Sequence, residues 1–316
     1  MKNKYNTNNI NLSKKYINNY SNKIILVCLL CLLLFIIIFY YSKKNIDNMN
    51  NMNTNNDTVI VPKYCTGFFA GCFHILKDIT TFFNNNKKLP TNVDTSQQFD
   101  TYKPSHIKGD IMLHFFKKRD DINIPYTDNL KFSHNLQFEK YNEIDYKELT
   151  PFIKKYFSPS HEILDIENKI TNKYNININI NEYCAVYYRG TDKKEETILG
   201  SFDTYIDKMN ELLTKEPNIK FIIQSDSKDF IDTVKSKFNN SISFDDENMP
   251  SSTDKGIHNE HSPDENYIII KNFLAIVYLL SKSKYIICSS GSCSIWMMLF
   301  RGNGNNIKQF LNNEWF

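Results

Sequence analysis

The chain has 316 residues, of which 41% are hydrophobic, 14% aromatic and 23% charged. This composition supplies buried cores for one large or two medium-sized domains and excludes an intrinsically disordered chain. The net charge of +3 arises at one end: residues 1–44 carry seven Lys and no acidic residue, which leaves 31 basic against 35 acidic residues in the rest. The globular part therefore lacks the basic surface of a nucleic-acid-binding protein.

The first predicted element is an apolar run at Ile24–Tyr41, with 18 residues and no charge. A membrane-spanning helix needs about 17–25 such residues. Five Lys precede the run and only Lys43 and Lys44 closely follow it, so the positive-inside rule places residues 1–23 in the cytosol. We therefore predict a signal anchor. The alternatives are a cleaved signal peptide, which lacks its small-residue cleavage site here, and a buried core helix.

This anchor predicts a single-pass type II membrane protein with a luminal C-terminal part. The span is short and ends in aromatic residues, which favours the thin bilayer of the endoplasmic reticulum or Golgi. Residues 42–56 are polar and low in complexity, as is typical of a stem. Beyond the stem we predict two domains, at 57–175 and 176–316. Cys184 and Cys288 lie in apolar, strand-like runs, which predicts buried thiols.

The first domain contains both helical and strand-like patterns of apolar residues. Phe68–Phe83 has helical apolar spacing and follows Thr66-Gly67. Asp110–Phe116 (DIMLHFF) predicts a strand. A further helix is expected from Ser158 to about Tyr174, because Ser is a good N-cap and the Pro that follows it fits the first turn.

The second domain alternates strands and helices. Strands are predicted at 182–188, 220–224, 241–244, 284–288 and 307–310, and helices at 201–213, 228–238, 265–281 and 292–300. Such alternation predicts βαβ units and a parallel sheet with both faces covered. Ligands of such sheets bind at the carboxyl ends of the strands.

Three polar motifs follow these strands. They are YYRGTDK at 187–193, followed by Glu195 and Glu196; QSDS at 224–227; and CSSGSCS at 288–294. The guanidinium of Arg189 can bind a phosphate with two parallel N–H bonds, and the small residues of the last motif can present amides to an anion. Each motif alone is also compatible with a surface turn or a helix cap. Their joint occurrence at one sheet edge favours a binding site.

Other chemistries lack their motifs. The sequence contains no G-x-x-x-x-G-K-[ST], no G-x-G-x-x-G after a strand, no G-x-S-x-G and no H-E-x-x-H. His258 and His261 stand three apart in a polar stretch without a nearby third ligand, which favours a solvated loop over a metal site. We predict neither a metal nor a bound cofactor.

The three motifs, with LLSKSKYIICSSGSCSIW at 279–296, resemble those of the α1,6-fucosyltransferase superfamily, which includes the core N-glycan and rhizobial nodulation enzymes. The resemblance covers about residues 182–302. It implies an α/β fold of GT-B type, with two Rossmann-like domains facing a cleft. It also implies that 57–175 is the acceptor side and that 176–316 binds the nucleotide sugar. The expected chemistry is inverting, metal-independent transfer from a nucleotide diphosphate sugar, with GDP-fucose as the first candidate.

The resemblance also assigns residues. Arg189 matches the arginine that holds the donor diphosphate, and Glu196, or Glu195, is the nearest candidate for the catalytic base. The donor-binding set is Arg189, Gly190, Thr191, Asp192, Lys193, Asp226, Ser290, Gly291 and Ser292, and Gly67 and Gly71 mark a loop on the acceptor side. The chain departs from the motifs at three places: Gly190 stands for a second Arg, Tyr187 for a His, and Ala275 or Ile276 for the Asp that reads guanine.

The sequence thus predicts a membrane-anchored glycosyltransferase that acts on a glycan or glycoprotein. One alternative is an inactive, membrane-tethered glycan-binding protein of the same fold, which the lost Arg and base-reading residues favour. Another is a structural luminal protein whose turns are only helix caps, which the order of the motifs disfavours.

Overall fold

The computed structural model describes residues 57–64, 66–127, 130–177, 182–190, 197–244, 246–247 and 261–316. Residues Thr58–Phe316 form one compact unit. One continuous apolar core runs through this unit, from Val59 and Phe68 in its first part to Trp296 and Ile307 in its last. The predicted division near residue 175 therefore separates two halves that share a core.

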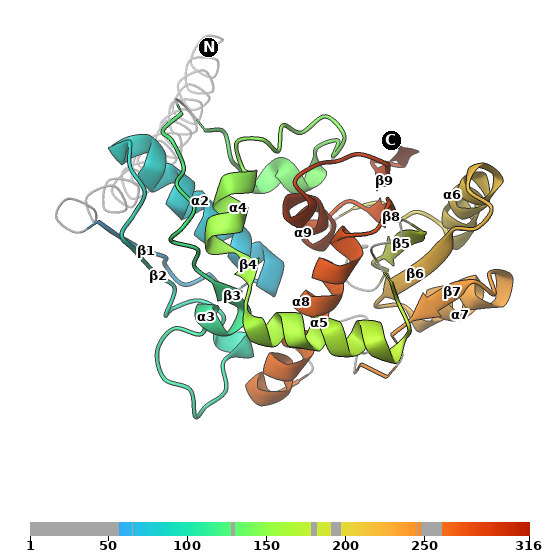
Figure 1. The fold of residues 1–316 in the computed structure, drawn as a ribbon, viewed down its shortest axis with the longest axis horizontal. Coiled ribbons are helices and arrows are strands. Elements are labelled where there is room, and N and C mark those ends of the chain that lie inside the picture. The colour runs from blue at the N-terminus through green and yellow to red at the C-terminus, as the bar shows by residue number, and fades with distance from the viewer. Residues whose placement is uncertain are drawn as a thin grey trace, which may run out of the picture. The chain divides into compact units, whose positions relative to one another are not determined.

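A six-stranded sheet forms the C-terminal half, at the right of Figure 1. Its strands are β5 (Tyr183–Tyr188), β6 (Lys220–Ser225), β7 (Ser241–Ser243), β8 (Tyr285–Ser289), β9 (Ile307–Leu311) and β10 (Glu314–Trp315). The order is β10-β9-β8-β5-β6-β7, and all neighbours are parallel except β10, which pairs antiparallel with β9. The chain winds outward from β5 in one direction through β6 and β7, and then returns to β8 on the other side. This Rossmann-type order places a topological switch point between β5 and β8.

Helices cover both faces of this sheet, as predicted. They are α6 (Phe202–Lys215), α7 (Lys228–Lys237), α8 (Pro263–Ser281) and α9 (Ser292–Arg301). Successive residues of β5 alternate between the faces: Val186 packs in the cluster of α6 and α7, and Ala185 in the cluster of α8 and α9. In Figure 1, α8 and α9 lie between the sheet and the N-terminal half. Two-sided burial explains why the strands are continuous apolar runs.

Serine caps fix the starts of the outer helices. The hydroxyl of Ser201 accepts a hydrogen bond from the amide of Thr204, and Ser227 caps α7 in the same way. Ser262 and Glu265 form a reciprocal capping box at the start of α8. These side chains satisfy amides that have no partner within the helix.

The N-terminal half holds one short βαβ unit. Strand β1 (Thr58–Ile60) pairs in parallel with β2 (Asn92–Asp94), and α2 (Phe68–Asn86) connects them. The other elements are η1 (Asp100–Tyr102), α3 (Met112–Phe115), β3 (Phe116–Lys117), η2 (His134–Phe138), α4 (Thr150–Tyr156), β4 (Ser158–Pro159) and α5 (His161–Lys173). Among the described residues of this half, the sheets have two strands each, so the sheet predicted for a second Rossmann-like domain is short here.

Two predicted elements of this half are wrong. The strand at Asp110–Phe116 is a short helix followed by two strand residues, because the Asp110 carboxylate accepts hydrogen bonds from the amides of Met112 and Thr95 and turns the chain. The helix expected at Ser158 begins three residues later. Ser158 pairs in an antiparallel ladder with Lys117, and Ser160 is the N-cap, whose hydroxyl accepts from the amide of Ile163.

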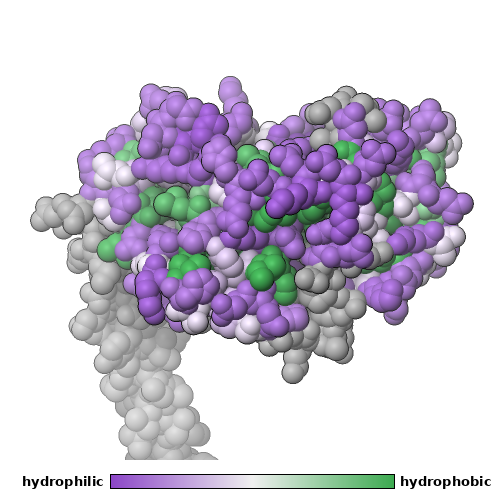
Figure 2. Space-filling view, turned by 60° about the horizontal axis from the view of Figure 1, so that its bottom comes forward, coloured by the Kyte–Doolittle hydropathy of each residue, from purple (hydrophilic) through white to green (hydrophobic). Residues whose placement is uncertain are grey.

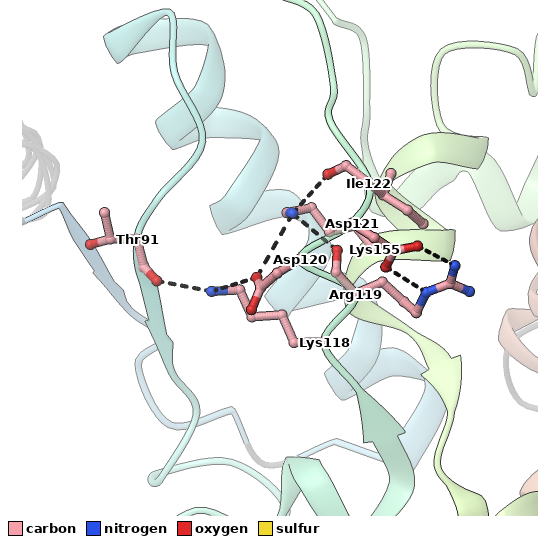
Figure 3. A network of polar contacts seen from close by, with 7 residues as sticks. All are labelled: Thr91, Lys118, Arg119, Asp120, Asp121, Ile122 and Lys155. Atoms are coloured by element: carbon pink, nitrogen blue, oxygen red, sulfur yellow. Dashed lines mark hydrogen bonds and ion pairs between the residues drawn. The ribbon is translucent and has the colours of Figure 1, made fainter.

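A buried lysine fixes the loop after β3 (Figure 3). The ammonium group of Lys155, on α4, donates to the carbonyls of Arg119 and Ile122 at 3.1 and 2.8 Å. Asp120 lies 4.0 Å from the same ammonium group. Arg119 pairs with Asp121 at the surface. Lys155 thereby satisfies loop carbonyls that would otherwise be buried without a donor.

Polar contacts also join the two halves. The Trp296 indole on α9 donates to the carbonyl of Phe69 on α2 at 3.0 Å. Gln309 on β9 accepts from the amide of Tyr141 and donates to the carbonyl of Glu139. The first contact joins α9 to the start of α2, and the Gln309 contacts join β9 to the segment that follows η2.

The face drawn in Figure 2 is mainly hydrophilic, with small, separate apolar patches. In the part of the chain that the structure describes, no helix is long and apolar enough to cross a membrane. The predicted span at 24–41 and stem at 42–56 lie outside the described residues. Cys184 and Cys288 are free buried thiols, as predicted, and Cys72 and Cys293 are free and buried as well.

Candidate functional site

The first motif lies at the carboxyl end of β5, beside the end of β6. Residue Tyr188 pairs with Ser225 in the parallel ladder, so Arg189 and Asp226 leave adjacent strands together. The Asp226 carboxylate accepts from the Gly190 amide at 2.8 Å, and its other oxygen lies 3.8 Å from Arg189 Nε. Asp226 therefore holds both the backbone and the guanidinium at this edge.

Glycine is required at position 190. A Cβ there would come within 2.4 Å of the Tyr188 ring, a distance that no side chain tolerates. The family motif that this segment resembles has an Arg at this position, and here its side chain would collide with Tyr188. Arg189 is therefore the arginine that this motif contributes at the sheet edge, where it pairs with Asp226.

The third motif forms the turn from β8 into α9, across the switch point from β5. Gly291 adopts φ 148°, which favours glycine, and its amide donates to the Tyr141 hydroxyl at 2.9 Å. The Ser292 hydroxyl donates to the Gln137 side-chain oxygen at 2.9 Å. Ser292 and Cys293 open α9, where backbone amides lack partners within the helix. The amides suited to an anion are thus those of the first turn of α9.

Ser290 links the turn after β8 to strand β9. Its hydroxyl and amide both donate to the Phe310 carbonyl, at 2.9 and 3.0 Å, and the hydroxyl accepts from Gln309 at 2.8 Å. The side chain is buried. Ser290 therefore fixes the turn, and its hydroxyl is already engaged with the protein.

Arg189 joins the two motifs. One of its terminal guanidinium nitrogens lies 3.9 Å from Cys293 Sγ, at the start of α9. The hydroxyls of Tyr187 and Tyr102 interact electrostatically with both residues. Burial raises the pKa of each phenol, so both remain protonated at neutral pH. Arg189, Asp226 and the first turn of α9 converge as the sequence predicts.

The start of α2 contacts Tyr102, one of the two phenols beside Arg189. Gly67 is the N-cap of α2, and the amide of Phe68 donates to the Tyr102 hydroxyl at 3.0 Å. The prediction that Gly71 shares a loop with Gly67 is wrong: Gly71 lies in the first turn of the helix, where its amide donates to the Gly67 carbonyl. A Cβ at Gly71 would meet the Phe99 ring at 3.3 Å, so this glycine serves close packing.

The remaining predicted site residues lie outside the described residues. They are Thr191, Asp192, Lys193 and the two candidate bases, Glu195 and Glu196. Their roles stay predictions.

An aromatic stack beside η2 was missed by sequence reasoning. The rings of Tyr64 and His74 stack at 3.7 Å, and His74 and His134 stack at 5.8 Å. His134 contacts the Gln137 side-chain amide, whose oxygen holds Ser292. All three rings are partly exposed. They come from three separate segments, so no local sequence pattern announces them.

The surroundings of this stack shift two ionisable groups. Burial, with the neighbouring His134 and Lys77, lowers the pKa of His74 to about 4. Burial raises the pKa of Asp78, one turn further along α2, to about 6. At neutral pH, His74 is therefore neutral and presents an uncharged ring beside an ionised carboxylate.

Two other predictions concern ligand identity. Ala275 and Ile276, which stand where the resembled family reads guanine, are fully buried in the core. His258 lies outside the described residues, and the residues that the structure does describe contain no cluster of three or more metal-ligating side chains. His261 precedes α8.

The solved structures that this chain is similar to include fucosyltransferases. No protein-family model matches the sequence, and no curated protein matches it. The fold is similar to a fucosyltransferase NodZ structure from Bradyrhizobium, at 12% identity and a TM-score of 0.48, covering 83% of this chain and 100% of that one. It is also similar to a NodZ α-1,6-fucosyltransferase co-crystallised with GDP, at 14% identity and a TM-score of 0.47, covering 83% of this chain and 98% of that one. A third similar structure is Arabidopsis thaliana FUT1 in complex with GDP, at 13% identity and a TM-score of 0.33, covering 83% of this chain and 52% of that one.

Proposed function

We propose that the protein is a glycosyltransferase that takes a sugar from a nucleotide diphosphate donor and transfers it to a glycan or glycoprotein. One observation carries the proposal: Arg189, positioned by Asp226, and the first turn of α9 meet at the switch point of a Rossmann-type sheet. A guanidinium and a row of helix amides at this place form a receptor for a diphosphate.

The proposed chemistry follows from charge. In an inverting transfer the acceptor oxygen attacks the anomeric carbon, the bond to the diphosphate breaks, and the diphosphate leaves with the electron pair. Arg189, Lys193 and the α9 amides would stabilise that negative charge. Glu196, or Glu195, would take the proton of the acceptor hydroxyl. Because side chains and amides neutralise the leaving group, the proposal includes no metal step. GDP-fucose is the first donor to test, as the sequence resemblance implies.

The acceptor would approach from the N-terminal half. The stack of Tyr64, His74 and His134 lies one side chain away from Ser292, through Gln137. Aromatic faces pack against the C–H faces of sugars, and the carboxylate of Asp78 can accept bonds from their hydroxyls. This arrangement supports a saccharide acceptor beside the donor site.

Titration of the full chain in detergent with GDP, UDP and their fucose, mannose and glucose derivatives tests the donor site. We expect wild type to bind one of the two nucleotide series. Arg189→Lys should weaken that binding about 10- to 100-fold, because an ammonium cannot make two parallel bonds to paired oxygens. Arg119→Lys, at the surface pair with Asp121, is the matched control. Absence of binding to every compound, or equal binding by the Arg189 variant, would remove the basis of the proposal.

We also propose that residues 24–41 anchor the enzyme in the endoplasmic reticulum or Golgi, with residues 57–316 in the lumen. The 18-residue apolar run and the Lys-rich segment before it support this topology. A C-terminal tag should resist protease in intact microsomes and be digested after detergent is added. Digestion without detergent would contradict the proposed orientation.

A further inference from the structure

A groove beside the end of α9 is not used by the proposed transfer. It has a volume of about 700 Å³, within the range of small-molecule sites. Three segments that are distant in the sequence line it: 122–123, several residues of 142–154, and the turn 302–305 that follows α9. We call it the α9-end groove.

Close backbone packing fixes the walls of the groove. A Cβ at Gly304 would come within 2.1 Å of the Tyr141 carbonyl oxygen, and one at Gly302, whose φ is 75°, would meet the Thr150 hydroxyl at 3.1 Å. The Thr150 hydroxyl donates to the Tyr146 carbonyl at 2.7 Å, and the Tyr146 phenol donates to the Tyr141 carbonyl at 2.9 Å. The turn after α9 is therefore held against the segment before α4. Because the walls are preorganised, a ligand would bind without ordering the chain.

The amide side chains of the groove are accessible and unpaired. Asn123, Asn142 and Asn305 line it and are exposed, and among the described residues their side chains have no hydrogen-bond partner. Each amide offers two N–H donors and one carbonyl acceptor, which matches the hydroxyls of a saccharide, since these also donate and accept. Ile144 and Pro151 are half-buried in the same groove and offer aliphatic surface to the C–H faces of sugar rings.

The groove also carries positive charge. Lys147 and Lys154 line it and are exposed, and neither forms an ion pair in the part of the chain that the structure describes. Asp145 is the one acidic side chain among the described lining residues, and its carboxylate accepts a hydrogen bond from the Lys147 amide at 2.9 Å. Two ammonium groups therefore face one carboxylate, which favours a ligand with an acidic group.

We propose that the α9-end groove binds a saccharide chain that carries a carboxylate or a sulfate. The asparagine amides bond its hydroxyls, and the two lysines pair with its acidic group. The inference is independent of the proposed transfer, because no residue assigned to the donor site lines the groove. The fully buried ring of Tyr141 separates the two places: its hydroxyl contacts the Gly291 amide, and its backbone carbonyl lies at Gly304.

Calorimetric titration of the full chain in detergent with tetragalacturonate, a sulfated heparin tetrasaccharide and neutral maltotetraose tests the site. We expect at least one of the acidic chains to bind about tenfold or more tightly than maltotetraose, and the tighter of the two identifies the acidic group. Changing both Lys147→Gln and Lys154→Gln should remove this preference. Lys169→Gln, at an exposed lysine of α5 that does not line the groove, is the matched control.

Two further variants locate the bound saccharide. Asn142→Trp places a large ring at an exposed position of the wall and should abolish binding, whereas Asn168→Trp, at an exposed position of α5, should leave it unchanged. Asn305→Ala removes one amide and should weaken binding about 3- to 10-fold. If Asn142→Trp does not fold, Asn305→Ala and the lysine pair still decide.

Nucleotide binding by Asn142→Trp, measured with GDP and UDP, should equal that of wild type, which separates a failure at this groove from a failure at the donor site. The proposal is overturned if neither acidic chain binds, or if the neutral chain binds as tightly as both acidic ones. Saccharide binding that Asn142→Trp and Asn305→Ala leave unaltered would also overturn it.

Discussion

At the residue scale, the candidate donor site rests on a few side chains that hold others in place. Asp226 orients both Gly190 and Arg189, and Gln137 holds Ser292. The sequence identified Arg189, Asp226 and Ser292 because each follows an apolar strand. It could not identify Gln137 or Tyr141, since these lie in and just after η2, about 150 residues before the turn that they contact. Long-range partners of this kind leave no local pattern.

The first prediction concerns Asp226. Asp226→Ala should cost about 1–3 kcal/mol in the free energy of unfolding, because the amide of Gly190 loses its acceptor at a partly buried position. Asp226→Asn keeps an acceptor oxygen of the same shape and should cost less, while still weakening nucleotide binding, because Arg189 loses the ion pair that orients it. Urea unfolding and calorimetry measure the two effects. Equal stability of the Ala and Asn variants would contradict the assigned role.

The second prediction concerns pH. Burial raises the pKa of Asp78 in the folded state to about 6 from 3.8. The folded state thus keeps a proton that the unfolded state loses, so this group destabilises the fold increasingly as the pH rises from about 4 to about 6. Asp78→Asn should therefore gain stability over wild type across that window, reaching about 1–2 kcal/mol at neutral pH after allowance for partial exposure.

Urea unfolding of both proteins at about pH 4.5 and pH 7.5 checks this. His74 acts in the opposite direction, because its lowered pKa makes the folded state lose stability as the pH falls from about 6.5 to about 4. Both proteins share His74, so it cancels from the difference. A difference in stability that does not change with pH would contradict the raised pKa of Asp78.

At the element scale, the C-terminal half follows its sequence closely and the N-terminal half does not. Strands β5, β6 and β8 are apolar runs bounded by polar residues, so their type and order could be read from the residues. In the N-terminal half, Asp110 and Ser160 redirect the chain through side-chain hydrogen bonds, and these overrule the apolar pattern of the segments that contain them. The antiparallel strand β10 has two residues and was likewise beyond prediction.

The third prediction concerns the start of α8, the long helix behind the sheet. Ser262→Ala removes the hydroxyl that caps the amide of Glu265 and should cost about 1 kcal/mol in stability. Ser236→Ala, on α7, is the matched control, because that hydroxyl bonds only a carbonyl one turn back and caps no helix start. Equal losses in the two variants, as measured by urea unfolding, would show that the capping box contributes nothing.

At the scale of the whole molecule, the two halves form one unit around a shared core, and the donor site lies where they meet. Trp296 is fully buried between them, with its indole bonded to Phe69 and its ring against Phe157 at 4.9 Å. Composition and strand order predicted an α/β chain with a ligand edge. The packing of α2 against α9 could not be foreseen, because it depends on contacts more than 200 residues apart in the sequence.

The fourth prediction follows from this shared core. Trp296→Ala should cost about 3–5 kcal/mol in the free energy of unfolding, since it leaves a large cavity and an unpaired carbonyl. Unfolding should remain a single transition, with circular dichroism and the fluorescence of the remaining Trp315 changing together. Trp315→Phe, at the partly exposed end of the sheet, is the control and should cost less. Two separate transitions in the wild-type protein would show that the halves unfold independently.

Hydrogen–deuterium exchange of the full chain, with and without the nucleoside diphosphate that binds, tests the donor site most directly. We expect slower exchange of the amides at 188–190 and 291–294 when the nucleotide is bound, because a diphosphate would cover the end of β5 and accept bonds from the first turn of α9. The amides at 282–285 and 301–306, near the starts of β8 and β9, should be unaffected. Protection confined to these two segments, or absent from both segments of the donor site, would contradict a diphosphate site at the end of β5.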